Sequence, residues 1–249
     1  MSNNQEQFKY STSVIVYPLI FVLSIWMVFW MQVRFFPSIK RLGVYPQELR
    51  GLLGVFTSPF IHADIEHLYH NSIPLFILSV ALFYFYRKIS WKVLFFGILL
   101  SGLFTWVIGR PANHIGASGL VYVLVSFIFF KGIFAKHYRL VALSLIVIFL
   151  YGSMIWYAFP IKEGMSWEGH LGGLLSGLLF AIIFRKAIAK PERYVWQHPD
   201  YNEEDDPFLR HFDENGNFIE LKEPEVEEEP ISEENDPLYN YTFKENKDD

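Results

Sequence analysis

Two side chains that can do chemistry together stand near the starts of two apolar segments of this chain. Ser118 lies in the tight sequence Gly-Ala-Ser-Gly of residues 116–119, and His170 lies in the sequence Gly-His-Leu-Gly-Gly of residues 169–173. A hydroxyl activated by an imidazole is the minimum apparatus for nucleophilic attack on an acyl carbon. Polar groups inside a bilayer are costly and tend to be functional, so this pair predicts acyl-transfer chemistry within a membrane.

The elements that must position this pair are apolar helices. Hydrophobic residues make up 52% of the 249 residues and aromatic residues 18%, a composition typical of a membrane protein. We therefore expect an all-α membrane protein with six transmembrane helices in residues 1–190, the first of them retained and not cleaved. Six segments lack charged residues and approach the length that crosses about 30 Å of hydrocarbon; they are residues 10–33, 67–86, 93–109, 111–130, 140–161 and 171–184.

Basic residues are distributed unevenly around these segments. With the N-terminus inside the cell, the inner connections hold 11 Lys and Arg residues and the outer connections hold 6. Inner loops of membrane proteins carry the excess of Lys and Arg, so we expect both termini to be cytoplasmic and the protein to be a multi-pass protein of a bacterial inner membrane. The second, fourth and sixth helices then begin at the outer face, which brings His67, Asn71, Ser118 and His170 to one depth.

Glycines surround His170 at helical spacing. Steps of three and seven residues from His170 reach Gly173 and Gly177, and Gly169 precedes it. These glycines form overlapping small-xxx-small repeats, which in membranes mark the close approach of two helices. We therefore expect the helix of His170 to pack tightly against the helix of Ser118.

Three separated motifs resemble, in type and in order, those of the rhomboid intramembrane serine proteases. The resemblance covers about residues 14–188. It implies a rhomboid-like bundle of six transmembrane helices with a membrane-associated first loop. The motifs are Gly-x-Ser-Gly at 116–119 with Tyr122 one turn beyond the serine, His170 with the glycine pair Gly173 and Gly177, and His62, His67 and Asn71 in the spacing His-x4-His-x3-Asn.

The resemblance implies a serine endopeptidase with a catalytic dyad. Ser118 would be the nucleophile, and His170 would be its general base and later the acid that protonates the leaving amine. The family has no acidic third member. Its substrates are single-pass transmembrane proteins that lie in the lipid bilayer and are cut in or near their transmembrane segments. We expect no cofactor, no metal and no nucleic-acid partner.

The same resemblance assigns supporting roles to four further residues. His67 and Asn71, together with the backbone N–H of Ser118, would donate hydrogen bonds to the oxyanion. Tyr122 would pack against the ring of His170 and hold its orientation. Gly116 belongs to the same supporting set, two residues before the nucleophile.

The first outer connection, residues 34–66, is too long and too apolar for a plain hydrophilic loop. Its Phe, Leu and Val residues alternate with basic residues, a pattern typical of short helices that lie in the membrane interface. The resemblance places this loop beside the active site. Many family members carry an adjacent Trp-Arg pair here, whereas residues 34–66 of this chain contain Arg50-Gly51 and no Trp, which leaves open how the loop is braced.

The histidines of this region admit a second interpretation. His62, His67 and His70, with two acidic residues between them, are residue types that bind zinc. Helical zinc proteases require the pattern His-Glu-x-x-His, and here Asn71 stands four residues after His67. We therefore expect these histidines to serve the oxyanion site or the surface, and not a metal ion.

Two other functions compete with a protease. A catalytically inactive rhomboid-like protein, which binds or escorts transmembrane clients, would be marked by loss of the serine or the histidine, and this chain has both. A small transporter would show interrupted helices and paired intramembrane charges, and only Pro74 and Pro111 hint at such breaks. The sequence favours the enzyme.

Residues 191–249 form a separate segment of different composition, with 20 Asp and Glu residues against 5 Lys and Arg. Such acidic runs predict a largely disordered cytoplasmic tail. Within it, residues 208–221 have the pattern of a small hairpin around Asn215-Gly216. The chain has no cysteine, which excludes disulfides and thiolate chemistry throughout.

Overall fold

The computed structural model describes residues 8, 10–185, 194, 196 and 198–220. Its internal contacts divide the chain into one unit of residues Met1–Glu192 and a second unit of residues Arg193–Asp249. The first unit holds the helical bundle and every candidate site residue. The part of the predicted disordered tail from residue 221 onward lies outside the described residues.

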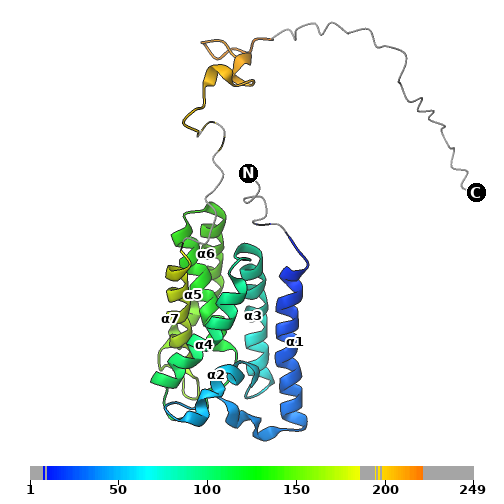
Figure 1. The fold of residues 1–249 in the computed structure, drawn as a ribbon, viewed down its shortest axis with the longest axis vertical. Coiled ribbons are helices and arrows are strands. Elements are labelled where there is room, and N and C mark those ends of the chain that lie inside the picture. The colour runs from blue at the N-terminus through cyan, green and yellow to red at the C-terminus, as the bar shows by residue number, and fades with distance from the viewer. Residues whose placement is uncertain (1–7, 9, 186–193, 195, 197, 221–249) are drawn as a thin grey trace, which may run out of the picture. The chain divides into compact units, whose positions relative to one another are not determined.

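The bundle is built from six apolar helices, in agreement with the all-α rhomboid-like prediction (Figure 1). Five of them are long and apolar enough to cross a membrane, counting α6 together with the 3-10 turn η4 that continues it. The sixth, α7, has 17 residues, which is at the short end of the range for a span. The helices are α1 (Ser13–Arg34), α3 (Ile65–Phe85), α4 (Ser90–Ile108), α5 (Ser118–Ala135), α6 (Tyr138–Tyr151) with η4 (Gly152–Ala158), and α7 (Trp167–Ile183).

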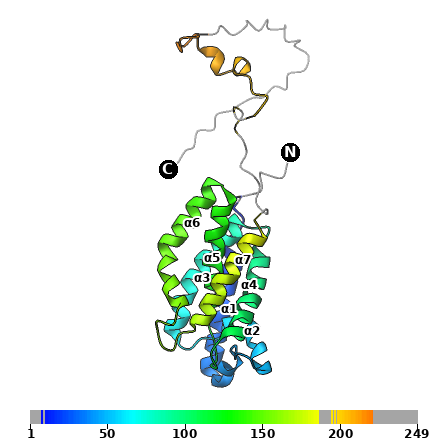
Figure 2. The ribbon, with the colours of Figure 1, turned by 90° about the vertical axis from the view of Figure 1, so that its left-hand side faces the viewer.

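Helix α5 lies in the interior of the bundle. It packs against α3, α4, α6 and α7, whereas α1 packs against α3 at the edge (Figures 1 and 2). Accordingly 61% of the α5 span is buried within the protein, against 17% of α1. A helix that is apolar all round and mostly buried is a rigid base for the side chain at its first position.

The outer surfaces of the other helices are strongly apolar. On α6 the side chain of Phe149 is 87% exposed, and Leu145, Ile146 and Leu150 are exposed beside it. A continuous apolar surface of this kind requires lipid and not water as its solvent. The chain is therefore a multi-pass membrane protein.

Helix α5 begins later than the charge-free segment that contains it. The charge-free segment begins at Pro111, but residues 111–117 form bends and a single β-bridge, and the helix begins at Ser118. The main chain of His114 pairs with Val44 of the first loop, and Gly116 has a φ of +110°, which no helix accepts. Ser118 therefore stands at the N-terminus of the helix, in agreement with the predicted place of this residue near the start of its apolar segment.

The first loop contains the expected short helices, namely η1 (Pro37–Leu42), η2 (Leu49–Leu52), α2 (Gly54–Thr57) and η3 (Ser58–Phe60). In place of a Trp-Arg pair, glycines brace it, because Gly51 and Gly54 let the backbone of residues 43–45 approach so closely that a Cβ would overlap it. Trp106 of α4 adds a hydrogen bond of 2.9 Å from its Nε1 to the carbonyl of Glu48. The loop is thereby tied to α4.

The described part of the second unit contains the expected tight turn. Phe212 and Phe218 form an antiparallel bridge across Asn215-Gly216, and Gly216 has a φ of +79°. The hairpin prediction is confirmed at this bridge, although the described residues contain no extended strand.

Candidate active site

Ser118 and His170 come within hydrogen-bonding distance of each other. Ser118 is the first residue of α5, and His170 lies in the first turns of α7. Their Oγ and Nε2 atoms are 2.9 Å apart, and the imidazole is buried. This is the distance at which an imidazole can take the proton of a serine hydroxyl.

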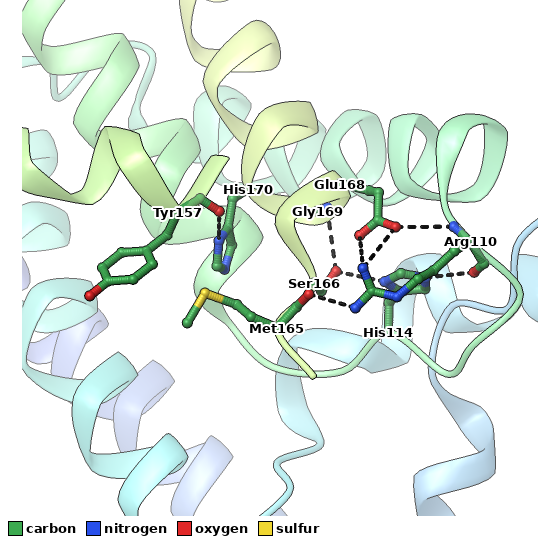
Figure 3. Close-up of polar contacts among 8 residues, drawn as sticks. All are labelled: Arg110, His114, Tyr157, Met165, Ser166, Glu168, Gly169 and His170. Atoms are coloured by element: carbon green, nitrogen blue, oxygen red, sulfur yellow. Dashed lines mark hydrogen bonds and ion pairs between the residues drawn. The ribbon is translucent and has the colours of Figure 1, made fainter. Parts of the chain in front are cut away.

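The second ring nitrogen of His170 decides which way this hydrogen bond runs. Nδ1 lies 2.8 Å from the main-chain carbonyl of Tyr157, which belongs to η4 (Figure 3). A carbonyl can only accept, so Nδ1 carries the proton and Nε2 of the neutral ring is free to accept from Ser118. The carbonyl thus sets the tautomer and orientation, as a carboxylate does in a catalytic triad.

The ring of Tyr122 lies flat against one face of the His170 imidazole. The two ring centroids are 4.3 Å apart with an angle of 11° between the planes. The Tyr122 hydroxyl donates a 2.6 Å hydrogen bond to the carbonyl of Met154, another residue of η4. The 3-10 segment therefore holds both rings through two main-chain oxygens.

The contact between α5 and α7 depends on small residues. A Cβ at Gly173 would overlap the carbonyl of Gly119 on α5, and a Cβ at Gly177 would overlap that of Val123. Gly169 is less tightly placed, with the nearest atoms to an added Cβ being the Oγ of Ser166 at 2.9 Å and the Oγ1 of Thr105 on α4 at 3.5 Å. Gly173 and Gly177 therefore set the close approach of the two helices that bring Ser118 and His170 together.

His67 and Asn71 of α3 face the backbone just before Ser118. A Cβ at Gly116 would lie 2.6 Å from the His67 ring and 3.4 Å from Nδ2 of Asn71, so only glycine allows these donors to approach. Nδ2 of Asn71 is buried and has no hydrogen-bond partner among the described residues. A buried donor without a partner is costly, and here it points to a ligand or intermediate that completes it.

A pocket opens beside Ser118. Hydroxyl and imidazole groups that can hold water line it along α4, the connection to α5 and the start of α7. The pocket therefore offers a polar site for water next to Ser118. Its polar lining consists of Ser58, Ser101, Thr105, His114, Ser118 and Ser166.

His62 supports the backbone immediately before the nucleophile. Its Nε2 accepts a hydrogen bond of 3.4 Å from the main-chain N–H of Ala117. Burial, helped by the neighbouring His67 ring, lowers the pKa of His62 to about 4, which keeps this nitrogen free to accept. Asp64, from the same acidic and histidine-rich segment, caps α3 by accepting from the main-chain N–H of His67 at 2.7 Å.

Sequence reasoning missed a polar network at the start of α7. Arg110 pairs with Glu168, and His114 contacts Ser166, so that the connection after α4 is joined to the residues just before His170 (Figure 3). The signal available was Glu168 itself, the single carboxylate beside His170 in an otherwise apolar segment. Helix α7 begins at Trp167 with Ser166 as its N-cap, so it includes Glu168 and His170 ahead of the charge-free segment of residues 171–184.

The comparisons with known proteins point to one family. The sequence model described as Rhomboid domain matches residues 49–187, which is more than half of the chain. The uncharacterised protein Rv1337 of Mycobacterium tuberculosis is 34% identical over 167 residues, covering 61% of this chain and 65% of the relative. The uncharacterised protein ML1171 of Mycobacterium leprae is 30% identical over 169 residues, covering 63% and 64%. The match thus spans slightly less than two thirds of the length of these relatives.

Proposed function

This chain belongs to the rhomboid family, and on that premise we propose that it is an intramembrane serine endopeptidase. The observation that carries the proposal is the 2.9 Å contact between Ser118 Oγ and His170 Nε2, with Nδ1 held by the carbonyl of Tyr157. This arrangement gives the serine a correctly oriented neutral base in a buried setting. The substrates would be single-pass transmembrane proteins cut in or near their membrane segments.

The proposed reaction has two stages. Ser118 Oγ attacks the peptide carbonyl while His170 Nε2 takes its proton, and the resulting imidazolium then protonates the leaving amine. Water, admitted through the polar pocket beside Ser118, attacks the acyl-enzyme while His170 Nε2 takes its proton. The imidazolium then returns that proton to Ser118 Oγ as the bond to the acyl group breaks and the acid product leaves. No acidic third residue is needed, because the Tyr157 carbonyl orients the ring.

Stabilisation of the oxyanion would come from the groups around Gly116. The unpartnered Nδ2 of Asn71 and the ring of His67 both face this backbone. Ser118 is the first residue of α5, so its N–H belongs to the first-turn amides that lack an intrahelical partner, at the positive end of the helix dipole. In a site of low dielectric each such donor contributes on the order of 3 kcal/mol to the transition state.

The alternative is a rhomboid-like protein that binds transmembrane clients without cutting them. A binding protein has no need for an oriented base or for a buried amide donor left without a partner. Both features are costly to maintain, and their presence around Ser118 favours the enzyme.

Covalent labelling with a fluorophosphonate probe, which reacts with activated serines, tests the proposal. We expect Ser118→Ala and His170→Ala to abolish both labelling and cleavage of a fluorogenic transmembrane substrate in the purified protein. Ser176→Ala is the matched control, since among the described residues its hydroxyl bonds only the Gly172 carbonyl of its own helix. Undiminished cleavage by either of the first two variants would rule out the dyad.

The proposed orientation places both termini in the cytoplasm and Ser118 near the outer face. The chain contains no cysteine, so single cysteines can be introduced without a background reaction. A cysteine at Glu163, in the connection before α7, should react with an impermeant maleimide in intact cells. A cysteine at Lys88, before α4, should react only after the cells are opened; the reverse pattern would invert the topology.

A further inference from the structure

A buried ion pair joins the connection after α4 to the first turn of α7. The Arg110 Nη1 lies 3.2 and 3.3 Å from the two carboxylate oxygens of Glu168, and the main-chain N–H of Arg110 donates to the same carboxylate at 3.2 Å. The Glu168 side chain is 1% exposed, whereas that of Arg110 is 41% exposed. The guanidinium also donates a 2.6 Å hydrogen bond to the carbonyl of Met165 (Figure 3).

A second series of hydrogen bonds joins the same two segments. Nε2 of His114 lies 3.0 Å from the carbonyl of Arg110, so Nε2 carries the proton and Nδ1 is left to accept. Nδ1 lies 2.6 Å from Oγ of Ser166, which therefore donates to it. The same Oγ accepts from the main-chain N–H of Gly169 and caps α7. Figure 3 shows that the ion pair and this series of hydrogen bonds both end at the residues just before His170.

The two sides of this network carry the two proposed reacting groups. One side is the connection of residues 110–117, which leads directly into Ser118. The other side is the segment of residues 165–169, which leads directly into His170. The contact between helices α5 and α7 continues at Gly173 and Gly177, which lie one and two turns beyond His170 along α7.

The Glu168 carboxylate is buried although the burial of a charge is unfavourable. Removing a carboxylate from water costs several kcal/mol, which a partly exposed arginine offsets only in part, so the pair is a poor source of stability. The described hydrogen bonds of Glu168 do not include Ser118 or His170. What the pair does supply is a fixed geometry, because Nη1 and the main-chain N–H of Arg110 both donate to the Glu168 carboxylate. No main-chain hydrogen bond given by the structure joins these two segments directly.

We propose that Arg110 and Glu168, with His114 and Ser166, form a clamp that sets the distance between Ser118 Oγ and His170 Nε2. The four are positioning residues, and their catalytic consequence rests on the proposed protease function. Small displacements at a reacting pair are costly, since a misplacement of about 1 Å can lower the rate by about 100-fold.

Substitution of Glu168 tests the clamp without burying a lone charge, because Arg110 can turn to solvent. In Glu168→Gln the amide oxygen still accepts while the amide NH₂ faces the guanidinium, so the clamp is weakened; in Glu168→Ala it is lost. We expect the second-order rate constant of fluorophosphonate labelling, per folded protein, to fall about 10-fold for Gln and about 100-fold for Ala. The control is Glu48→Gln, which breaks the exposed 2.6 Å pair with Arg50 on the first loop.

A second readout reports the geometry without catalysis. The ¹⁵N shifts of the His170 ring, assigned by their loss in His170→Ala, report the hydrogen bond to Ser118. We expect them to change in Glu168→Gln and to stay unchanged in Glu48→Gln. A merely structural role would lower the yield of folded protein and leave both the rate constant and the ring shifts of the folded fraction as they are.

The outcomes separate the clamp from the protease. Labelling within about twofold of wild type in both Glu168 variants, with unchanged His170 shifts, would overturn the clamp and leave the protease standing. Wild-type protein that takes no probe, together with shifts that move in Glu168→Gln, would support the clamp and overturn the protease. Unlabelled wild type with unmoved shifts would overturn both.

Discussion

Tyr122 and His170 stack face to face, with ring centroids 4.3 Å apart and 11° between their planes. The stack joins the second turn of α5 to the first turns of α7, and both rings are tied to main-chain oxygens of η4, those of Met154 and Tyr157. An imidazole fixed on one face by an aromatic ring and at one edge by a carbonyl has little freedom to turn away from Ser118. The ring and the hydroxyl of Tyr122 therefore make separable contributions.

Tyr122→Phe and Tyr122→Leu should separate these contributions. Phe keeps the stack and loses only the bond to Met154, so we expect kcat to fall less than about 10-fold. Leu removes the flat face that restrains the imidazole, and we expect a fall of about 100-fold with KM little changed. Steady-state cleavage of a fluorogenic substrate measures both; equal losses in the two variants would show that the hydroxyl and not the ring holds His170.

Gly177→Ala should force α5 and α7 apart. The added methyl would overlap the Val123 carbonyl and lie 2.8 Å from the main-chain nitrogen of Phe127, and backbone cannot move aside as a side chain can. We expect a loss of about 1–3 kcal/mol in stability together with reduced activity. Thermal unfolding in detergent measures the loss. Gly152→Ala is the control, because its methyl would meet only the flexible Ile148 side chain at 3.1 Å.

Asn71→Ala should weaken the stabilisation of the transition state and leave substrate binding in the ground state unchanged. Its Nδ2 is buried without a partner among the described residues, so it has a free hydrogen bond to give to an oxyanion. We expect kcat to fall by about 10²- to 10³-fold with KM nearly constant. Ser79→Ala is the matched control, since Ser79 is also buried and unpartnered but lies two turns further along α3. Loss of activity through KM alone would contradict the oxyanion role.

His62 should make the protein less stable as the pH falls. Burial lowers its pKa from 6.5 to about 4 in the folded protein, so between these values the unfolded chain binds a proton that the folded protein does not. The contribution of His62 to the free energy of unfolding is fully present above about pH 6.5. It decreases toward pH 4, by up to about 3 kcal/mol. Protonation would also remove the acceptor for the Ala117 N–H.

The measurement is thermal unfolding between pH 4 and pH 7 in wild type, His62→Gln and the control His70→Gln, whose side chain is exposed. We expect the unfolding temperature of His62→Gln to vary less with pH than that of the other two proteins. Parallel curves for all three would assign the pH dependence to other groups.

The fold class followed from the sequence because apolar length and charge are local properties. Six charge-free segments are enough to predict six helices, since a backbone in hydrocarbon must satisfy its own hydrogen bonds. The helix bounds were less accurate wherever a tertiary contact decides them. The fourth segment begins at Pro111 by composition, but the pairing of His114 with Val44 delays the helix to Ser118.

The pairing of Ser118 with His170 was also within reach of the sequence, because residue type, depth and flanking glycines all point to it. What only the tertiary structure decided is how the pair is held. The carbonyls of Tyr157 and Met154 are main-chain groups, which every residue has, so the residue types at these positions do not indicate this role. Arg110 and Glu168 stand 58 residues apart, and an ion pair depends on where two chain segments meet in space and not on either residue alone.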